Sequence, residues 1–389
     1  MTEQNTRVVV IGGGYAGVIA ANHLRLAPRL DVTLVNPRPR FVERIRLHQF
    51  ITGSDDAVVD YAEILGPDIT LVTDAATRFD TATRQVHLRD GVALPYDYLI
   101  YAVGSDAGGP TVPGADEFAY SVTGFEGATR LAAVLAELPD GAPVCVVGAG
   151  STGLETAAEL AEQGRAVTLV CGLALGPYLS ASGRRSVSRR LRRLGVRIIE
   201  GPGATVVAVA AEAVTLADAR VLPSAVTIWT AGFGVPDLAT RSGLRTDAIG
   251  RLLTDETLTS LDDPRIVAAG DAAAPSGMPL RMSCQAAIPL GAQAANTVLA
   301  RVAGETPVAI DQAFTGQCIS LGRGAGIVQL ARRDDTALPM CLGGRAAALV
   351  KEALCKYTVG TLRREARKPG SVFWLKGGRR DVADAVSVP

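Results

Sequence analysis

The feature that most constrains the fold is an apolar, β-branched run near the N-terminus that breaks into glycines. Residues 7–11 form the run, and glycines follow at Gly12, Gly14 and Gly17. This G-x-G-x-x-G spacing predicts a strand, a tight turn and a helix that together bind a dinucleotide. The first glycine makes the turn, the second admits a pyrophosphate, and the third lets the helix pack closely on the strand. The anion then lies at the positive end of the helix.

A second copy of this motif occurs at Gly148, Gly150 and Gly153, again between an apolar run and a helix-forming segment. One copy alone also fits a turn that binds no nucleotide, but two copies in the same context favour two nucleotide sites. In such a site the second strand usually ends in an acid that hydrogen-bonds the adenosine ribose. The two positions here hold Asn36 and Cys171. Because an acid there favours NADH over NADPH, the sequence leaves the choice of nicotinamide dinucleotide open.

Composition indicates a folded chain of more than one domain. The 389 residues are 48% hydrophobic and 20% charged, which is enough apolar material for large buried sheets. The formal net charge is zero, so no nucleic-acid partner is expected. Six cysteines without a C-x-x-C pair indicate reduced thiols of a cytoplasmic protein, and no metal site is predicted. A polar stretch at 1–7 leaves no room for a signal peptide, and no apolar run approaches the ~18–20 residues of a membrane span.

The segment at residues 37–50 is unusually polar for its place beside a nucleotide motif. It is expected to form a turn and a helix, for which two interpretations stay open. The segment is either a solvated surface helix, or it turns Arg44, Arg46 and His48 toward the cofactor. Cations there would offset phosphate or reduced-cofactor charge.

Two further runs end in small residues beside the expected nucleotide sites. Residues 68–105 are β-rich, with a hairpin turn at Asp90-Gly91 and a last strand that ends at Gly104. A glycine- and proline-rich cluster at 108–114 then predicts a domain crossing.

The run at 265–274 predicts a strand that delivers Asp271, after Gly270, onto the start of a helix. A carboxylate there can hold a sugar hydroxyl, and the helix N-terminus can face an electron-rich ring. Other helices are expected over 18–26, 128–138, 154–163, 181–194 and 346–367.

The helix at 181–194 is rich in arginine, and its apolar positions share one face. We expect the arginines to face solvent, with a phosphate-binding role for Arg184 or Arg185 as the alternative. No aromatic residues interleave the charges, which argues against a nucleic-acid surface.

The C-terminal part predicts a hairpin over 317–329 and an amphipathic helix over 346–367. The residues expected near one helix face are Leu349, Val350, Leu354, Tyr357, Thr358 and Leu362, and the basic residues around them are Lys351, Lys356, Arg363, Arg364 and Arg367. The pattern fits a peripheral helix on anionic lipid, with Phe373 and Trp374 as anchors. It fits equally a helix that docks on this subunit or on a partner copy, as in a homodimer.

The order of these parts resembles the pyridine nucleotide-disulfide oxidoreductase superfamily, and within it the type II NADH:quinone dehydrogenases. The resemblance rests on both glycine motifs, on 99–105, on Trp229-Thr230-Ala231-Gly232 and on Gly270-Asp271, and it covers about residues 7–330. It implies an α/β fold with two Rossmann-like dinucleotide-binding domains of the three-layer ββα type and a C-terminal α+β extension. The expected regions are 1–110 and 235–310 for FAD, 111–234 for NAD(P)H, and 311–389 for acceptor, interface or membrane contact.

The resemblance also implies which residues meet the cofactors. The expected FAD contacts are Gly12, Gly14, Tyr15, Ala16, Gly17, Asn36, Arg44, Gly104, Gly270, Asp271, Gln285 and Ala286, and the expected NAD(P)H contacts are Gly148, Gly150 and Gly153. Glu155 matches the acid that lies near nicotinamide and flavin in this family; the alternative is a glutamate that stabilises the helix start. Gln285 is the expected acceptor contact; the alternative is an amide that links two loops. Cys284 replaces the usual small residue there.

The disulfide-reductase branch of the superfamily carries a redox-active cysteine pair after the second strand. Residues 41–50 contain no cysteine, and the first cysteine of the chain is Cys145, so dithiol chemistry is not expected. The predicted function is hydride transfer from NAD(P)H to FAD and electron transfer to a quinone, with Glu155, Gln285 and His48 as catalytic candidates. Two alternatives stay open, a soluble flavoenzyme that tailors a quinone-like or aromatic metabolite and a non-catalytic nucleotide sensor. The expected location is the cytoplasm or the inner face of the membrane.

Overall fold

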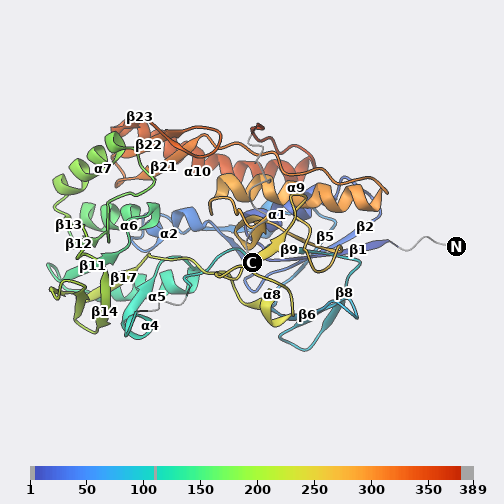
Figure 1. The fold of residues 1–389 in the computed structure, drawn as a ribbon, viewed down its shortest axis with the longest axis horizontal. Coiled ribbons are helices and arrows are strands. Elements are labelled where there is room, and N and C mark those ends of the chain that lie inside the picture. The colour runs from blue at the N-terminus through green and yellow to red at the C-terminus, as the bar shows by residue number, and fades with distance from the viewer. Residues whose placement is uncertain (1–4, 109–111, 378–389) are drawn as a thin grey trace.

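The computed structural model describes residues 5–108 and 112–377 and contains two five-stranded parallel sheets (Figure 1). The first sheet has the order β19-β9-β1-β2-β5. Its strands are β1 (Thr6–Ile11), β2 (Leu30–Val35), β5 (Ile69–Val72), β9 (Tyr98–Tyr101) and β19 (Ile266–Ala268). Strand β19 pairs with β9 although the whole of the second sheet lies between them in sequence. The first sheet is therefore completed across a long insertion.

The first sheet is the middle one of three layers. Helices α1 (Tyr15–Leu24) and α9 (Cys284–Val302) pack against each other above it in Figure 1, and antiparallel strands lie below it. These strands are β6 (Ala76–Asp80), β7 (Gln85–Leu88) and β8 (Ala93–Pro95). Because both faces are covered, the strands of the sheet read as continuous apolar runs. The expected turn at Asp90-Gly91 joins β7 to β8, as predicted.

The second sheet, of order β10-β17-β11-β12-β13, repeats this plan. Its strands are β10 (Ala119–Ser121), β11 (Pro143–Val147), β12 (Ala166–Val170), β13 (Arg197–Ile199) and β17 (Val226–Trp229), and its helices are α5 (Phe125–Glu137), α6 (Ser151–Glu162) and α7 (Ala181–Arg193). A second antiparallel sheet shares a core with it and contains β14 (Val206–Ala210), β15 (Ala213–Leu216) and β16 (Val221–Pro223). The expected α/β fold with two Rossmann-like units is confirmed.

The C-terminal region spans both units. A three-stranded antiparallel sheet, β21 (Gly316–Ser320), β22 (Gly326–Ala331) and β23 (Ala337–Gly343), leads into helix α10 (Gly344–Arg367). Ile319 and Ile327 join the core of the second unit, whereas Val359 and Leu362 of α10 join the core of the first. Figure 1 shows α10 running above α9 and α1 toward this sheet. The predicted hairpin and helix are both present, and strand β23 was not predicted.

The remaining elements are short. They are β3 (Arg40–Val42), η1 (Arg44–Arg46), α2 (Leu47–Phe50), β4 (Val58–Asp60), α3 (Tyr61–Ile64), α4 (Ala115–Phe118), α8 (Leu238–Arg241), β18 (Leu252–Thr254), η2 (Gly270–Ala272) and β20 (Ala273–Pro275). Within the described ranges, none of the helices combines the length and the apolar character that crossing a bilayer requires. Residues 109–111 of the expected domain crossing lie outside the described residues.

Three expectations from the sequence are corrected. Residues 41–50 do not form a solvated helix: they contain the end of β3, then η1 and α2. Arg46 and His48 are only 5% and 3% exposed, since α6 packs on α2 and Arg46 pairs with Glu352 of α10. Asp271 lies in the three-residue 3-10 helix η2, so the expected helix start is a single turn before strand β20; the long helix α9 begins only at Cys284.

The third correction concerns α10, whose six apolar or small residues do not share one face. Thr358 and Leu362 are buried, whereas Leu349 and Tyr357 are exposed. The helix buries the stripe that packs on α1, α3 and β22 and leaves the opposite stripe to solvent.

Candidate functional site

The first glycine loop has the shape that a phosphate requires. Gly12 has a positive φ of 104°, and a Cβ there would collide with the Ala102 carbonyl; a Cβ at Gly17 would collide with the Gly12 carbonyl. Gly14 differs from both, since nothing lies within 4 Å of a Cβ built on it. Gly14 is also the N-cap of α1 and makes no side-chain cap bond, so the first amides of the helix have no side-chain acceptor at the cap. The outer glycines serve packing, and the middle one borders open space.

The second glycine loop repeats this division. Gly148 has φ 115°, and a Cβ on it would lie 2.6 Å from the Thr230 hydroxyl oxygen. A Cβ on Gly153 would collide with the Gly148 carbonyl, whereas Gly150 borders open space. Both loops therefore fit a dinucleotide phosphate at the start of a helix.

The two positions where an acid was expected carry no charge. The Asn36 side chain accepts from the Gly13 amide at 3.0 Å and donates to the Arg38 carbonyl at 2.8 Å, so it holds the loop itself. Burial raises the pKa of the Cys171 thiol to about 12, so it is neutral at pH 7. At the second loop, where NAD(P)H is expected, the strand therefore ends without a carboxylate that would repel the extra phosphate of NADPH.

A polar cluster joins three segments at the carboxyl edge of the first sheet. The Ser105 hydroxyl donates to Asp271 at 2.7 Å, and Arg44 donates to Ser105 at 3.1 Å and lies 3.8 Å from Asp271. A Cβ on Gly104, whose φ is 72°, would lie 3.7 Å from the Arg44 guanidinium. The structure thus brings Arg44, Gly104 and Asp271 together, at the edge where open α/β sheets bind ligands.

Helices α1 and α9 meet beside this cluster through small residues. A Cβ on Gly270 would lie 2.9 Å from that of Ala16, and Ala286 is buried with its amide capped by Ser283. The Tyr15 ring packs edge-on against Phe41 with 5.0 Å between centroids. The Tyr15 hydroxyl is buried and makes no hydrogen bond within the described part of the chain. Burial raises the pKa of Tyr15 well above its ordinary value.

The most unusual group of side chains is a buried set of three ionisable residues. Glu155 lies on α6 just after the second glycine loop; the Lys351 ammonium of α10 is 2.8 Å from its Oε1, and His48 Nδ1 is 3.7 Å from its Oε2. The Ser320 amide of β21 also donates to Glu155 Oε1 at 3.0 Å. The alternative role of Glu155 as a mere helix-start charge is thus too narrow, because the carboxylate joins α2, α10 and β21.

The charges in this set support one another. Burial alone raises the pKa of Glu155, but Lys351 and His48 outweigh burial and leave that pKa below its ordinary value. Burial lowers the pKa of Lys351, yet the Glu155 carboxylate more than compensates and raises it. Burial lowers the pKa of His48 to about 4. At pH 7 the set therefore contains a carboxylate, an ammonium and a neutral imidazole.

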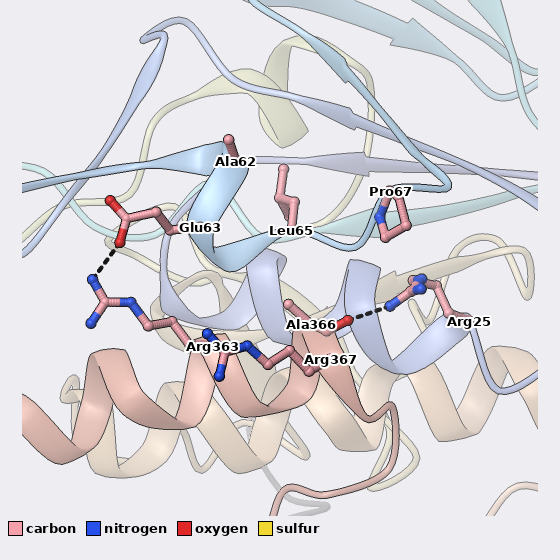
Figure 2. A pocket seen from close by; sticks show the side chains of 8 residues that line it. All are labelled: Arg25, Ala62, Glu63, Leu65, Pro67, Arg363, Ala366 and Arg367. Carbon is pink, nitrogen blue, oxygen red and sulfur yellow. Dashed lines mark hydrogen bonds and ion pairs between the residues drawn. The ribbon is translucent and has the colours of Figure 1, made fainter.

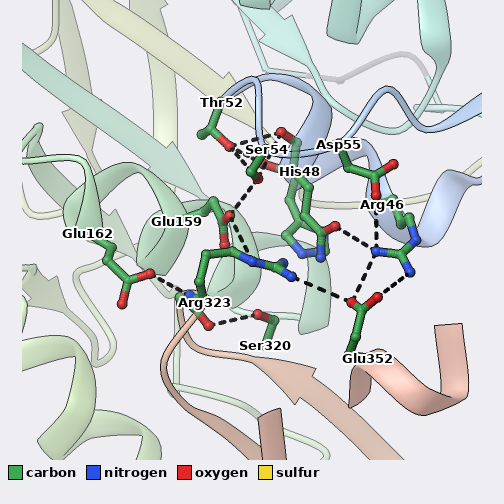
Figure 3. A network of polar contacts seen from close by, with 12 residues as sticks. Arg46, His48, Thr52, Ser54, Asp55, Glu159, Glu162, Ser320, Arg323 and Glu352 are labelled. Carbon is green, nitrogen blue, oxygen red and sulfur yellow. Dashed lines mark hydrogen bonds and ion pairs between the residues drawn. The ribbon is translucent and has the colours of Figure 1, made fainter. Parts of the chain in front are cut away.

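The Arg46 guanidinium belongs to the polar network of Figure 3, which continues through Glu352 and Arg323 to Glu159. Its guanidinium lies 3.0 Å from Glu352 and 3.2 Å from Asp55, and it bonds Glu43 at 3.3 Å and Gln49 at 2.9 Å. Arg44, Arg46 and His48 thus do not act together: each of the three side chains has its own partners. Arg46 therefore joins α10, through Glu352, to the loop that follows β3, through Glu43.

Gln285 makes side-chain contacts that join two segments of the chain. Its amide lies 2.6 Å from the Thr315 hydroxyl and, in the orientation that satisfies both ends, 3.1 Å from the Gly316 carbonyl. It links the start of α9 to the segment before β21, and its side chain stays half-buried.

From the sequence, Lys351 is expected among the basic residues around the apolar face of the helix, and the structure corrects this. Its side chain is 13% exposed. Lys351 shares the buried stripe of α10 with Ala347, Cys355, Thr358 and Leu362, which lie at i−4, i+4, i+7 and i+11 from it. A lone lysine in such a stripe is the signal that could have found it.

Comparisons with known proteins agree with this arrangement. The chain matches the family described as pyridine nucleotide-disulphide oxidoreductase over residues 6–305. It is 33% identical over 324 residues to an NADH dehydrogenase-like protein of Mycobacterium tuberculosis, covering 76% of this chain and 80% of that one. It is 28% identical over 353 residues to a type II NADH:quinone oxidoreductase of the same organism, covering 77% and 74%.

A solved structure shows the same fold. The sulfide:quinone oxidoreductase of Aquifex aeolicus superposes with a TM-score of 0.80 at 20% identity and covers 94% of this chain and 93% of its own. Two phosphate-shaped loops, the sheet topology and the sequence match agree. The chain belongs to the pyridine nucleotide-disulphide oxidoreductase family, as an oxidoreductase that uses FAD and NAD(P)H.

Proposed function

We propose that this NAD(P)H dehydrogenase reduces a quinone and uses no redox disulfide. The observation that carries the proposal is the buried His48–Glu155–Lys351 set, which holds an ionised carboxylate just beyond the second glycine loop. Residues 41–50, where the disulfide-reductase branch carries its cysteine pair, contain none. A relative named for quinone reduction supports the class of acceptor.

The two loops would divide the cofactors between them. FAD would lie on Gly12–Gly17, with Arg44 beside its phosphates and Asp271 on its ribityl side, and NAD(P)H would lie on Gly148–Gly153. When bound, FAD takes hydride from the nicotinamide and passes electrons to the acceptor. The chain's own residues orient the two partners and exclude water.

The buried set would serve the acceptor. Lys351 keeps Glu155 ionised, so the carboxylate is free to accept a proton and to pass it to a quinone oxygen. His48 Nε2 is buried and makes no hydrogen bond with any described residue; because Nδ1 of the neutral imidazole faces the Glu155 carboxylate and carries the hydrogen, Nε2 can accept one there. The half-buried Gln285 would line the same side, held in place by Thr315.

Spectroscopy of the purified protein tests the function directly. We expect flavin absorbance, anaerobic bleaching on addition of NADH or NADPH, and faster reoxidation by a naphthoquinone than by oxygen. If neither nucleotide bleaches the flavin, the protein is a non-catalytic nucleotide sensor and not a dehydrogenase. Bleaching followed by turnover with a small aromatic metabolite, and none with quinones, would indicate a tailoring enzyme.

We further propose that the exposed stripe of α10 rests on anionic lipid. Its apolar half and the adjoining strand β23 expose Leu349, Val350, Leu354, Tyr357, Met340 and Leu342, with Leu349 exposed to 73%. The C-terminal half of the same helix carries Arg363, Arg364 and Arg367. An apolar stripe that continues into cations suits an interfacial helix.

A cavity lies at the basic end of this stripe (Figure 2). It measures about 490 Å³ and is lined by Arg25, Arg363 and Arg367 together with Leu65 and other residues of α3 and its loop. Arg363 pairs with Glu63 at 2.6 Å, and the buried Nε of Arg25 makes no hydrogen bond among the described residues. Cations above apolar side chains give a lipid phosphate a place to bind beside α10.

A further inference from the structure

Quinone reduction needs one proton that the nicotinamide does not supply. A hydride brings two electrons and one proton, whereas a quinone takes up two electrons and two protons to become a quinol. Each turnover therefore consumes NAD(P)H, one quinone and one solvent proton and yields NAD(P)⁺ and one quinol. Glu155 is 8% exposed, so a proton that reaches it must first cross the protein surface.

One face of α6 carries a row of carboxylates from the surface to that point. Glu159 lies three residues from Glu162 and four from Glu155 along one side of the helix, and the whole row spans roughly 10 Å. Their side chains are 29%, 3% and 8% exposed. The row thus begins at the surface with Glu162 and passes through Glu159 before it reaches Glu155.

Glu159 has a free oxygen in this buried place. Its Oε1 accepts from the Ser54 hydroxyl at 2.9 Å, while its Oε2 is fully buried and makes no hydrogen bond within the described residues. The neighbouring His48 Nε2 is likewise buried and unpartnered there (Figure 3). A buried polar atom without a partner is costly in a folded protein, and such atoms occur where a group changes its protonation state.

We propose that Glu159 carries the solvent proton of quinone reduction from Glu162 at the surface to Glu155 inside. The inference rests on the proposed quinone acceptor. Glu159 acts through Glu155 and does not itself touch the flavin or the quinone, so it is a positioning residue and not a catalytic one.

The surroundings of Glu159 suit a carboxyl that is protonated and released in turn. Four groups face Glu159. They are Ser54 of the loop after α2, Arg323 of the β21–β22 turn, whose Nε lies 4.0 Å from Glu159 Oε1, and Glu155 and Glu162 on the same helix. Burial raises the pKa of Glu159, and the Ser54 hydrogen bond and Arg323 oppose that rise only in part. The pKa of Glu155 is lowered beside Lys351 despite its burial, so Glu155 is a weaker base than Glu159, and the proton moves on from Glu159 only as the quinone takes one up from Glu155.

The test compares acceptors that differ in their need for protons. Holoenzyme with Glu159→Gln should reduce a water-soluble naphthoquinone roughly tenfold to a hundredfold more slowly, with a larger solvent deuterium isotope effect and a steeper loss at alkaline pH. Its rate with ferricyanide, which takes electrons alone, should stay unchanged. Glu159→Asp should recover part of the quinone rate. The matched control is Glu137→Gln, which removes an exposed glutamate of α5.

Infrared difference spectra give a readout apart from turnover. The carboxyl C=O band that disappears in Glu159→Gln should titrate above the ordinary range of a glutamate. Equal quinone rates and isotope effects in Glu159→Gln and wild type would overturn the proposal, as would an equal loss with ferricyanide, which signals a structural fault. Wild-type protein that reduces ferricyanide but no quinone would instead contradict the proposed function.

Discussion

The ion pair of Glu155 with Lys351 is the most consequential contact at the residue scale. Both partners are buried, so neutralising one leaves the other as an uncompensated charge. Lys351→Met is expected to lower the free energy of unfolding by about 3 kcal/mol. Urea unfolding measures the loss, and the double variant with Glu155→Gln should regain most of it. A double variant no more stable than Lys351→Met would contradict the pairing.

His48 makes stability depend on pH. Its pKa is lowered from 6.5 to about 4 in the folded chain, so the unfolded chain binds a proton that the folded chain does not. The stabilisation is complete above pH 6.5 and is lost as the pH falls toward 4, by roughly 3 kcal/mol in all. In His48→Gln the urea midpoint of unfolding should depend less on pH between 4 and 6.5 than in wild type. Glu155, whose pKa is lowered, acts below 4.5; Glu43 and Glu159, whose pKa values are raised, act within the window but are present in both proteins, so the difference between wild type and His48→Gln isolates the histidine.

At the scale of elements, the two glycines of the first loop have separable duties. Gly14→Ala should fold normally, because φ is −79° and the added methyl meets open space, but it should lose most of its FAD because that space is the phosphate site. Gly17→Ala should lower the free energy of unfolding by about 1–3 kcal/mol, because the added methyl meets the Gly12 carbonyl, and the protein should therefore unfold at a lower urea concentration. Circular dichroism and flavin content separate the two outcomes. Equal flavin content in Gly14→Ala and wild type would place the phosphate elsewhere.

Helix α10 gives the second prediction at this scale. Wild-type protein should sediment with anionic vesicles and less with zwitterionic ones, and the pair Leu349→Glu and Tyr357→Glu should abolish this binding while leaving flavin reduction intact. Leu173→Glu is the matched control, because Leu173 is 75% exposed in the second unit. A charged pair that changed the sedimentation coefficient in solution, with vesicle binding unaltered, would identify the stripe as a contact between copies.

At the scale of the whole molecule, the sequence predicted what local pattern determines. The strands around both glycine motifs, the Asp90-Gly91 turn and helix α10 follow from periodicity and turn chemistry. The meeting of His48 with Glu155 and Lys351 does not, because it depends on how a helix more than 300 residues away packs over α2 and α6. For the same reason the exposed and buried stripes of α10 could not be told apart: amphipathicity gives the period, and only tertiary packing chooses which face is covered.

Strand β19 gives the molecule a particular order of completion during synthesis. The segment that holds the second sheet, residues 119–229, leaves the ribosome whole, whereas the edge of β9 stays unpaired until residues 266–268 follow it. The earliest motif of the chain therefore belongs to the unit that finishes last. A nascent chain that stops at Leu261 should show protease protection in the second sheet and none in the first, and its open β9 edge is where chaperones or a neighbouring chain would bind.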